Sequence, residues 1–553
     1  MLDIPELDEL ICQQLSRHDL TQCTRVCKKW RRIVTPYIWR DLSSGDFSEP
    51  QQAAFVQLVA GDYLQEQQHQ ETHHERRSMG QQLLSPPYRP LAKYGHLVQR
   101  LPCPKTLERY FEGHSIRLQL KELVPDGHDI PSKLVLMEHL YKQCPNFQTE
   151  LVTIDTLDNQ MDLAELIREH VLPRTRCLQF PSGNDFITSF RLKWMLNRSS
   201  TLEQLILCAN IYSRIDEKEK AYDQEEPETW QLKRLTMRNC RDVTNNNTFW
   251  PWLWKRCGQV EHLEVDNIHN DIWKQLIESG ITYMPNLDKV TITSFTLDKK
   301  HIEALLSSSR RGWKEVRLHY YCESLPPTPT AYLMKHRLTL QRLVLDGYCG
   351  VTESEKAQLL ACCPHLCDFT DVHTMDHENG VPFGFNAHSF IDLDPDTGSL
   401  RRWECEASLK VLKVIIKDIP RPDLYTKTID ESYSGQGRDI QNQVYDRLAL
   451  FTNLEILSLR VNFGNPAASS CLEMSLESGL DKLSGLKRLK VLDVSGMETE
   501  IGEPEAQWMI KQWPKLRTIQ GLPLWGGYNE AWDWLQKHHP EIDLKKPSID
   551  YEI

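Results

Sequence analysis

Apolar residues recur in a fixed pattern through the middle of the chain. Leu202 is followed by Leu205 and Leu207, and Asn210 comes three residues later. The alternation at Leu205 and Leu207 is the period-two pattern of a strand with one buried face. The sequence therefore predicts a short strand here, with Asn210 at the turn that follows it.

The same pattern returns five more times. Its further copies are Leu232, Leu235 and Met237; Val260, Leu263 and Val265; Leu287, Val290 and Ile292; Trp313, Val316 and Leu318; and Leu340, Leu343 and Leu345. Their first positions lie 30, 28, 27, 26 and 27 residues apart, close to the ~20 to 29 residues of a leucine-rich repeat, whose signature the pattern resembles. We predict regular repeats over 200–372.

Later copies of the pattern are less evenly spaced, with intervals of 26, 43, 45, 35 and 27 residues. They begin at Leu366, Leu409, Leu454, Leu489 and Leu516. The spacing predicts insertions near 373–400 and 418–447, and both segments are rich in Asp, Gly and Pro, which is typical of loops. We expect the C-terminal repeats and a cap around Trp525 and Trp532 over 448–553, and irregular units over 91–180.

A proline precedes several repeats, at Pro145, Pro285, Pro364 and Pro514. Proline ends a helix and pushes its predecessor toward extended geometry, so each unit is predicted to run helix, proline, strand. Stacked units of this kind form an α/β fold: a curved leucine-rich-repeat solenoid with a parallel sheet on the concave face and helices on the convex face.

The N-terminus has a helical pattern instead. Leu7, Leu10, Ile11 and Leu15 recur at three- and four-residue steps, which predicts one short helix. A second helix is expected to open at Asp19 with a capping box and to run to Val34, because Pro36 would break it. A third short helix is expected up to Leu42. Three helices of this size share a very small core, so a partner is expected to cover their apolar faces.

These N-terminal residues resemble the F-box motif over residues 2–42, with Ile4 where that family usually has leucine. The resemblance implies a three-helix F-box that binds a Skp-type adaptor and, through it, a cullin. The adaptor-binding residues that it implies are Ile4, Pro5, Leu7, Leu10, Ile11, Leu15, Leu20, Val26, Cys27, Trp30 and Trp39. The predicted domains are the F-box at 1–42, a polar linker at 43–90 that is flexible or partly helical, and the repeat domain at 91–553.

Composition restricts the class of partner. The chain has 553 residues, 40% of them hydrophobic, and a formal net charge of -12, so we expect a folded protein that repels nucleic acid and anionic lipid. The sequence shows neither a secretory signal nor about 18 consecutive apolar residues, and its 16 cysteines are scattered. We expect an intracellular protein, in the cytoplasm, the nucleus or both, with reduced cysteines and no membrane partner.

One charge asymmetry on the predicted sheet suggests a second binding surface. The later repeats carry a more basic set of side chains between the core positions, which predicts binding of an acidic or phosphorylated segment of a target protein. These candidate target-binding residues are Arg317, Arg342, Lys410, Lys413, Arg460 and Lys490.

Motifs for bond chemistry are absent from the sequence, which contains no Walker, dinucleotide-binding, zinc-protease or nucleophile-elbow signature. Cys23 and Cys27, and the group of Cys362, Cys363 and Cys367, fit core packing better than a metal site. We therefore expect no enzyme, no cofactor and no metal. The resemblance implies the substrate-recognition subunit of a ubiquitin ligase. A scaffold that uses the adaptor without ubiquitin transfer, and an enzyme of unrecognised type, stay open as alternatives.

Overall fold

The computed structural model describes most of the predicted repeats and part of the N-terminal helices. The described residues are 12, 17–23, 25–26, 28–40, 49–79, 90–98, 132–144, 146–147, 149–153, 167–180, 186–212, 230–242, 249–294, 299–320, 329–347, 351–371, 384–419, 431–461, 470–497, 501–522 and 529–546. The chain forms two compact units, Met1–Gln259 and Val260–Ile553. The domain boundaries expected at residues 42 and 90 remain predictions.

The first unit combines helices with a parallel sheet. Its main strands, in sheet order, are β1 (Thr149–Thr153), β2 (Thr175–Phe180), β4 (Gln204–Leu207) and β6 (Arg234–Arg238). Its helices are α2 (Arg17–Cys23), α3 (Lys28–Arg40), α4 (Glu49–Met79), α5 (Pro90–Tyr94), η1 (Gly95–Leu97), α8 (Lys133–Gln143), η2 (Ile167–Val171), η3 (Leu172–Arg174), α10 (Ser189–Asn197) and α12 (Phe249–Trp254).

The second unit continues the repeat pattern through a longer parallel sheet. Its strands, in sheet order, are β8 (His262–Asp266), β9 (Lys289–Ser294), β10 (Glu315–Tyr320), β11 (Arg342–Asp346), β12 (Asp368–Asp371), β14 (Val411–Val414), β16 (Ile456–Ser458), β17 (Val491–Asp493), β18 (Thr518–Gln520) and β19 (Asp543–Lys545). Its helices are α13 (Asn270–Gln275), η4 (Leu276–Gly280), η5 (Ile281–Tyr283), α14 (Lys299–Ser308), α15 (Thr330–Leu333), η6 (Met334–His336), α16 (Glu353–Cys362), α17 (Ala387–Ile391), α19 (Glu431–Ala449), η8 (Leu480–Gly485), α20 (Glu503–Gln512) and α21 (Glu530–His538).

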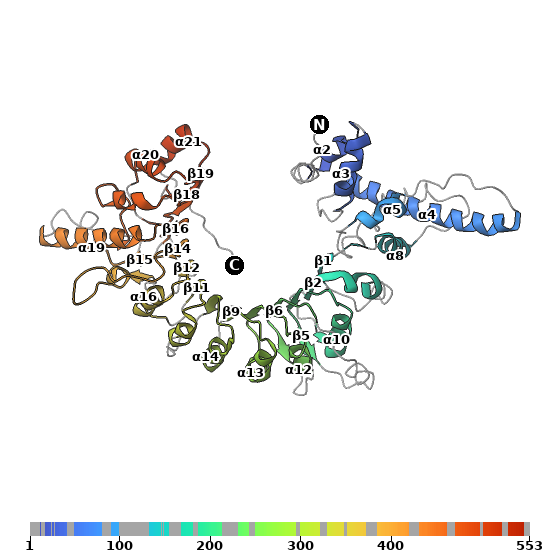
Figure 1. Cartoon of the computed structure of the whole chain (residues 1–553), viewed down its shortest axis with the longest axis horizontal. Helices are drawn as coiled ribbons and strands as arrows, with labels where there is room; N and C mark the ends of the chain where they lie inside the picture. Colours follow the sequence, from blue (N-terminus) through green and yellow to red (C-terminus); the bar gives the residue numbers. More distant parts are fainter. Residues whose placement is uncertain are drawn as a thin grey trace. The chain divides into compact units, whose positions relative to one another are not determined.

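The predicted core positions stack from strand to strand. Val316 on β10 is in register with Val290 on β9 and Leu343 on β11, and all three side chains are buried. Within the second unit the helices lie on one side of this sheet (Figure 1). We call the opposite side the open face. The prediction of an α/β leucine-rich-repeat solenoid with a parallel sheet flanked by helices is confirmed.

The helix, proline, strand junctions are also confirmed. Met284, Cys363 and Trp513 each follow a helix and precede a proline, and their ψ angles are 64°, 87° and 77°. These values lie outside the helical range because the ring of the next residue excludes it. The proline therefore sets where each helix ends and its strand begins.

Two small parallel sheets were not predicted. One contains β3 (Phe186–Thr188), β5 (Asn210–Tyr212) and β7 (Arg241–Asp242), and the other contains β13 (Phe385–Asn386) and β15 (Ile416–Lys417). Asn210 thus begins a strand where we expected a turn. At the equivalent position of the next repeat, the buried thiol of Cys240 donates to the carbonyl oxygen of Leu207 at 3.2 Å.

The insertions contain more helix than we expected. Segments 373–400 and 418–447 were predicted as loops, yet the first contains α17 and the second contributes most of α19, which includes Gly435 and Gly437. The loop prediction is therefore wrong for these parts. Apolar residues farther along α19, such as Val444, Tyr445 and Leu448, are buried, and burying that face favours helix despite the glycines.

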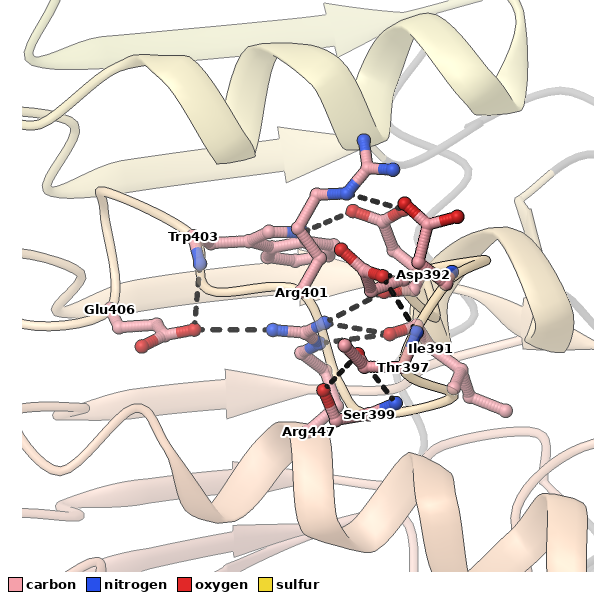
Figure 2. A network of polar contacts seen from close by, with 10 residues as sticks. Ile391, Asp392, Thr397, Ser399, Arg401, Trp403, Glu406 and Arg447 are labelled. Atoms are coloured by element: carbon pink, nitrogen blue, oxygen red, sulfur yellow. Dashed lines mark hydrogen bonds and ion pairs between the residues drawn. The ribbon is translucent and has the colours of Figure 1, made fainter.

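A buried arginine joins α19 to the segment after α17. Arg447 is fully buried, and its guanidinium donates to the carbonyl oxygen of Ile391 at 2.7 Å and to Oε1 of Glu406 at 3.1 Å. It also lies 4.3 Å from the ring centroid of Trp403, whose indole donates to Asp392 Oδ2 at 2.9 Å (Figure 2). Side chains far apart in the sequence thus form one polar network within the second unit.

Gly496 lies at a turn that only glycine fits without strain. Its φ is +76°, and a Cβ atom there would lie 1.9 Å from the carbonyl oxygen of Val461. We expect Gly496→Ala to reduce the free energy of unfolding by at least about 2 kcal/mol, through left-handed strain and the clash with backbone. Urea denaturation measures this, with Gly485→Ala as the matched control because its Cβ would meet nothing within 4 Å. Equal stability of the two variants would contradict the prediction.

Candidate functional site

The N-terminal site is built from α2, α3 and the turn between them. The turn is closed by hydrogen bonds from the backbone N–H of Arg25 to Gln22 O and of Val26 to Cys23 O. The predicted single helix from Asp19 to Val34 is therefore wrong, since α2 begins before Asp19 and ends at Cys23. Pro36 lies inside α3, which also includes most of the predicted third helix.

Packing explains why Pro36 does not end α3. Cys12, Leu20 and Val34 form a small buried core, and partly buried apolar side chains pack against it from both sides of Pro36; these are Cys23, Trp30, Ile33, Tyr37 and Ile38. Burial of Tyr37 and Ile38 favours continued helix even though proline removes one backbone donor. Tertiary contact thus overrides the local signal.

The predicted adaptor-binding residues have different environments. Leu20 is buried in this core, Trp30 packs against it, and Trp39 stacks on Tyr94 of α5 with ring centroids 5.3 Å apart. Val26 exposes 69% of its surface, the largest value among the exposed apolar side chains of the described residues. The remaining predicted residues lie outside the described part of the chain; they are Ile4, Pro5, Leu7, Leu10, Ile11, Leu15 and Cys27.

Helix α4 occupies much of the predicted linker and is attached to the rest of the first unit by a buried polar cluster. Asp62 on α4 accepts a hydrogen bond from the backbone N–H of Leu91 at 2.9 Å and lies 3.1 Å from Nε2 of His139 on α8. The other ring nitrogen of His139 lies 3.2 Å from Glu66. A histidine between two carboxylates connects α4 with α8, and sequence reasoning missed this cluster because its members lie 77 residues apart.

On the open face, two predicted target-binding residues are engaged in ion pairs. Arg317 Nε lies 2.7 Å from Glu315 Oε1, and Arg342 Nε lies 2.7 Å from Asp368 Oδ2. Arg342 also lies 3.7 Å from Glu315. Positive and negative side chains therefore alternate in one row across β10, β11 and β12. Burial, the largest single effect, raises the pKa of Glu315. The hydrogen bond from Arg317 and the positive charges of Arg317 and Arg342 together outweigh burial, so the pKa of Glu315 is lowered.

The other predicted target-binding residues lie on the later strands. Lys410 is exposed and directly precedes β14, and Lys413 is half-buried within that strand. Lys490 Nζ lies 2.5 Å from Glu455 Oε2, and this bond, together with the positive charges of Lys490 and Lys410, lowers the pKa of Glu455. Arg460 is half-buried and has polar contacts of its own. The binding role of all six residues stays a prediction.

A histidine pair on the open face was not found from the sequence. His319 Nδ1 lies 2.6 Å from Asp346 Oδ2, and this hydrogen bond raises the pKa of the imidazole. The two residues occupy the same register position on β10 and β11. Their equal offset from the leucines of each repeat was the signal that would have paired them.

Several cysteines are buried and poorly suited to act as thiolates. Burial raises the pKa of Cys144 and of Cys363 to about 12, and it also raises the pKa of Cys257 and Cys405. Cys367 donates to the carbonyl oxygen of Gln341 at 3.1 Å. Among the described residues, no group of three or more His, Cys, Asp or Glu side chains is arranged to hold a metal ion, and no helix there is long and apolar enough to cross a membrane.

Comparison with known proteins identifies the N-terminal segment. Residues 5–44 match the family model described as F-box-like, so the chain carries an F-box-like domain at its N-terminus. No curated protein matches the sequence. Similar solved structures include an internalin from Listeria monocytogenes, with 13% identity, 76% of this chain and 84% of that chain covered, and a TM-score of 0.29. The yeast Rad7 and Elc1 complex has 11% identity, coverage of 74% and 83%, and a TM-score of 0.36.

Proposed function

We propose that this chain is the target-recognition subunit of an intracellular Skp-cullin-F-box ubiquitin ligase. Its N-terminal helices bind a Skp-type adaptor, which connects the chain to a cullin, and its repeats hold a target protein. The observation that carries the proposal is the F-box-like match over residues 5–44, within which Val26 is an exposed apolar side chain.

The proposed mechanism is positional. A target held on the repeats stays at high local concentration near the ubiquitin-charged enzyme, so a bimolecular transfer becomes nearly unimolecular. The chain itself forms no covalent bond in this scheme. Cys144 and Cys363 in particular are unsuited to carry ubiquitin as a thioester, because a thiol of pKa about 12 is almost entirely protonated at neutral pH.

The adaptor contact is tested most cleanly at Val26. Trp30 and Trp39 both pack within the first unit, so replacing either one disturbs the fold as well as the surface. We expect Val26→Asp to weaken binding of purified Skp adaptor at least about tenfold, since the interface would bury an unpaired carboxylate. Size-exclusion chromatography and calorimetry of the full chain with the adaptor measure this.

Val26→Ile is the matched control, because it keeps an apolar group at the same exposed position. It should bind the adaptor as the unmodified chain does, and both variants should keep the same circular dichroism spectrum. If the unmodified chain and the adaptor elute as two separate peaks, the proposed function is wrong. If Val26→Asp binds normally, Val26 is not part of the interface.

Ubiquitin transfer requires a separate experiment, because a scaffold that binds the adaptor without promoting ubiquitin transfer would give the same result in the binding test. Co-purification of a cullin with the chain, and a longer half-life of captured proteins when the chain is deleted, are the results expected of a ligase subunit. Captured proteins whose half-lives do not change would favour the scaffold.

A further inference from the structure

The charged residues of the open face are balanced on the early strands of the second unit. Lys314 Nζ lies 2.7 Å from Asp288 Oδ2, Arg342 lies 2.7 Å from Asp368, and Arg317 lies 2.7 Å from Glu315. Each of these cations already has a carboxylate partner on the chain. A new anion would have to compete with those partners, so this part of the sheet offers little net attraction to an acidic ligand.

The balance changes at the later strands. Lys410, Glu455, Lys490 and Arg517 occupy the position just before β14, β16, β17 and β18, and consecutive members are joined by backbone hydrogen bonds of 2.7 to 2.8 Å. Lys410, Lys490 and Arg517 are exposed. We call these three side chains the cationic edge. Glu455 is their one acidic neighbour in this row, and a single carboxylate compensates one of the three charges.

Other acidic side chains close to the cationic edge have partners of their own. Asp493 on β17 is buried and accepts hydrogen bonds from Ser458 Oγ at 2.9 Å and from Ser495 Oγ at 2.6 Å. Asp543 on β19 lies 3.4 Å from Lys545. Glu455 is itself 2.5 Å from Lys490, and the low pKa that Lys490 and Lys410 cause keeps it ionised. The serine hydroxyls orient the Asp493 carboxylate without neutralising it, but the row itself contains three cations and one anion, so it has a net positive charge in a chain whose overall charge is -12.

We propose that the cationic edge binds an extended acidic segment of a partner protein. Neighbouring strands lie about 4.8 Å apart, so the edge spans about 14 Å from β14 to β18, a length that about five residues of extended peptide would cover. Lys410 and Arg517, at the two ends of the edge, would meet carboxylates about four residues apart in such a segment, and Lys490 would meet a carboxylate between them. Lys413, half-buried farther along β14, lies next to the path.

This inference differs from the sequence-based prediction in the residues that it uses. Arg317 and Arg342 are left out because each has its own carboxylate partner on the early strands, whereas on the later strands one carboxylate, Glu455, lies in a row with three cations; Arg517 is added. The inference rests on the proposed function only in calling the bound protein a target. Peptide binding at the edge is independent of the adaptor and is measured without it.

The test uses the full chain and a fluorescein-labelled peptide of ten residues in which glutamate and serine alternate. Fluorescence anisotropy at low ionic strength should show binding that weakens as salt is added. The triple variant Lys410→Glu, Lys490→Glu, Arg517→Glu should bind at least about tenfold more weakly, since three attractions become repulsions.

The matched control carries the same change of net charge on the helices. Lys335→Glu, Lys511→Glu, Lys537→Glu alters three exposed lysines of η6, α20 and α21, and it should bind within about twofold of the unmodified chain. An equal loss in both triple variants would overturn the proposal, because the overall charge would then explain the binding. So would equal binding of the same peptide with glutamine in place of glutamate.

Two further readouts keep the outcomes distinct. The triple variant at Lys410, Lys490 and Arg517 is called the edge variant. If a single-stranded DNA oligonucleotide binds the unmodified chain more tightly than the acidic peptide does, and the edge variant no longer binds it, the assignment to a protein segment is overturned. The edge variant should also retain its melting temperature and its binding to the Skp adaptor. Failure of the unmodified chain to bind the adaptor would defeat the proposed function and leave the peptide result standing.

Discussion

Replacing Arg447 with alanine is expected to reduce the free energy of unfolding of the second unit by about 3 to 5 kcal/mol. The guanidinium is fully buried and hydrogen-bonded to Ile391 O and to Glu406, so its loss leaves the largely buried Glu406 carboxylate without its cationic partner and the Ile391 carbonyl without its donor. The side chain also fills the space against Trp403, and removing it leaves a cavity there. Both effects have the same sign.

Amide hydrogen exchange of segment 384–419 and a urea denaturation curve measure this change. Arg438→Ala is the matched control, since Arg438 lies on the same helix, α19, and is exposed. We expect that control to stay within about 0.5 kcal/mol of the unmodified chain. Arg447→Lys should be intermediate, because lysine keeps the charge but lacks the planar fork that contacts two acceptors at once. Unchanged exchange in Arg447→Ala would show that packing alone holds this segment.

In the first unit, Asp62→Ala is expected to reduce the free energy of unfolding by about 3 to 5 kcal/mol. Asp62 is buried, accepts the backbone N–H of Leu91, and faces Nε2 of His139 at 3.1 Å. Its removal leaves the Leu91 N–H and His139 Nε2 buried without this acceptor. A buried polar group without a partner carries its full desolvation penalty. Because α4, α5 and α8 meet at this carboxylate, all three helices should lose protection from hydrogen exchange together.

Glu138→Ala is the control for Asp62→Ala. Glu138 lies on α8, one residue from His139, and forms an exposed ion pair with Lys142 at 2.5 Å. Exposed pairs of this spacing contribute about 0.5 kcal/mol or less, so α4 should keep its protection in this variant. Similar losses of protection in the two variants would mean that the charge of α8, and not the Asp62 cluster, controls the packing of α4.

The sequence by itself determined the repeat architecture of this protein. The spacing of leucines such as Leu343 and Leu345 sets which strand face is buried, and prolines such as Pro364 set where a helix must end. Both effects are local, because they depend on side-chain alternation and on the proline ring. They can therefore be predicted from the sequence without any knowledge of the fold. The F-box resemblance rests equally on local order and spacing, and the match over residues 5–44 agrees with it.

Only the tertiary structure decided which charged groups meet and which local signals are overruled. Pro36 lies inside α3 because Tyr37 and Ile38 gain burial, and Arg317 forms an ion pair with Glu315. Arg447 and Asp62 have their partners 56 and 29 residues away in the chain. A contact between residues far apart in the sequence depends on how repeats and helices stack. The periodicity of the sequence does not predict such contacts.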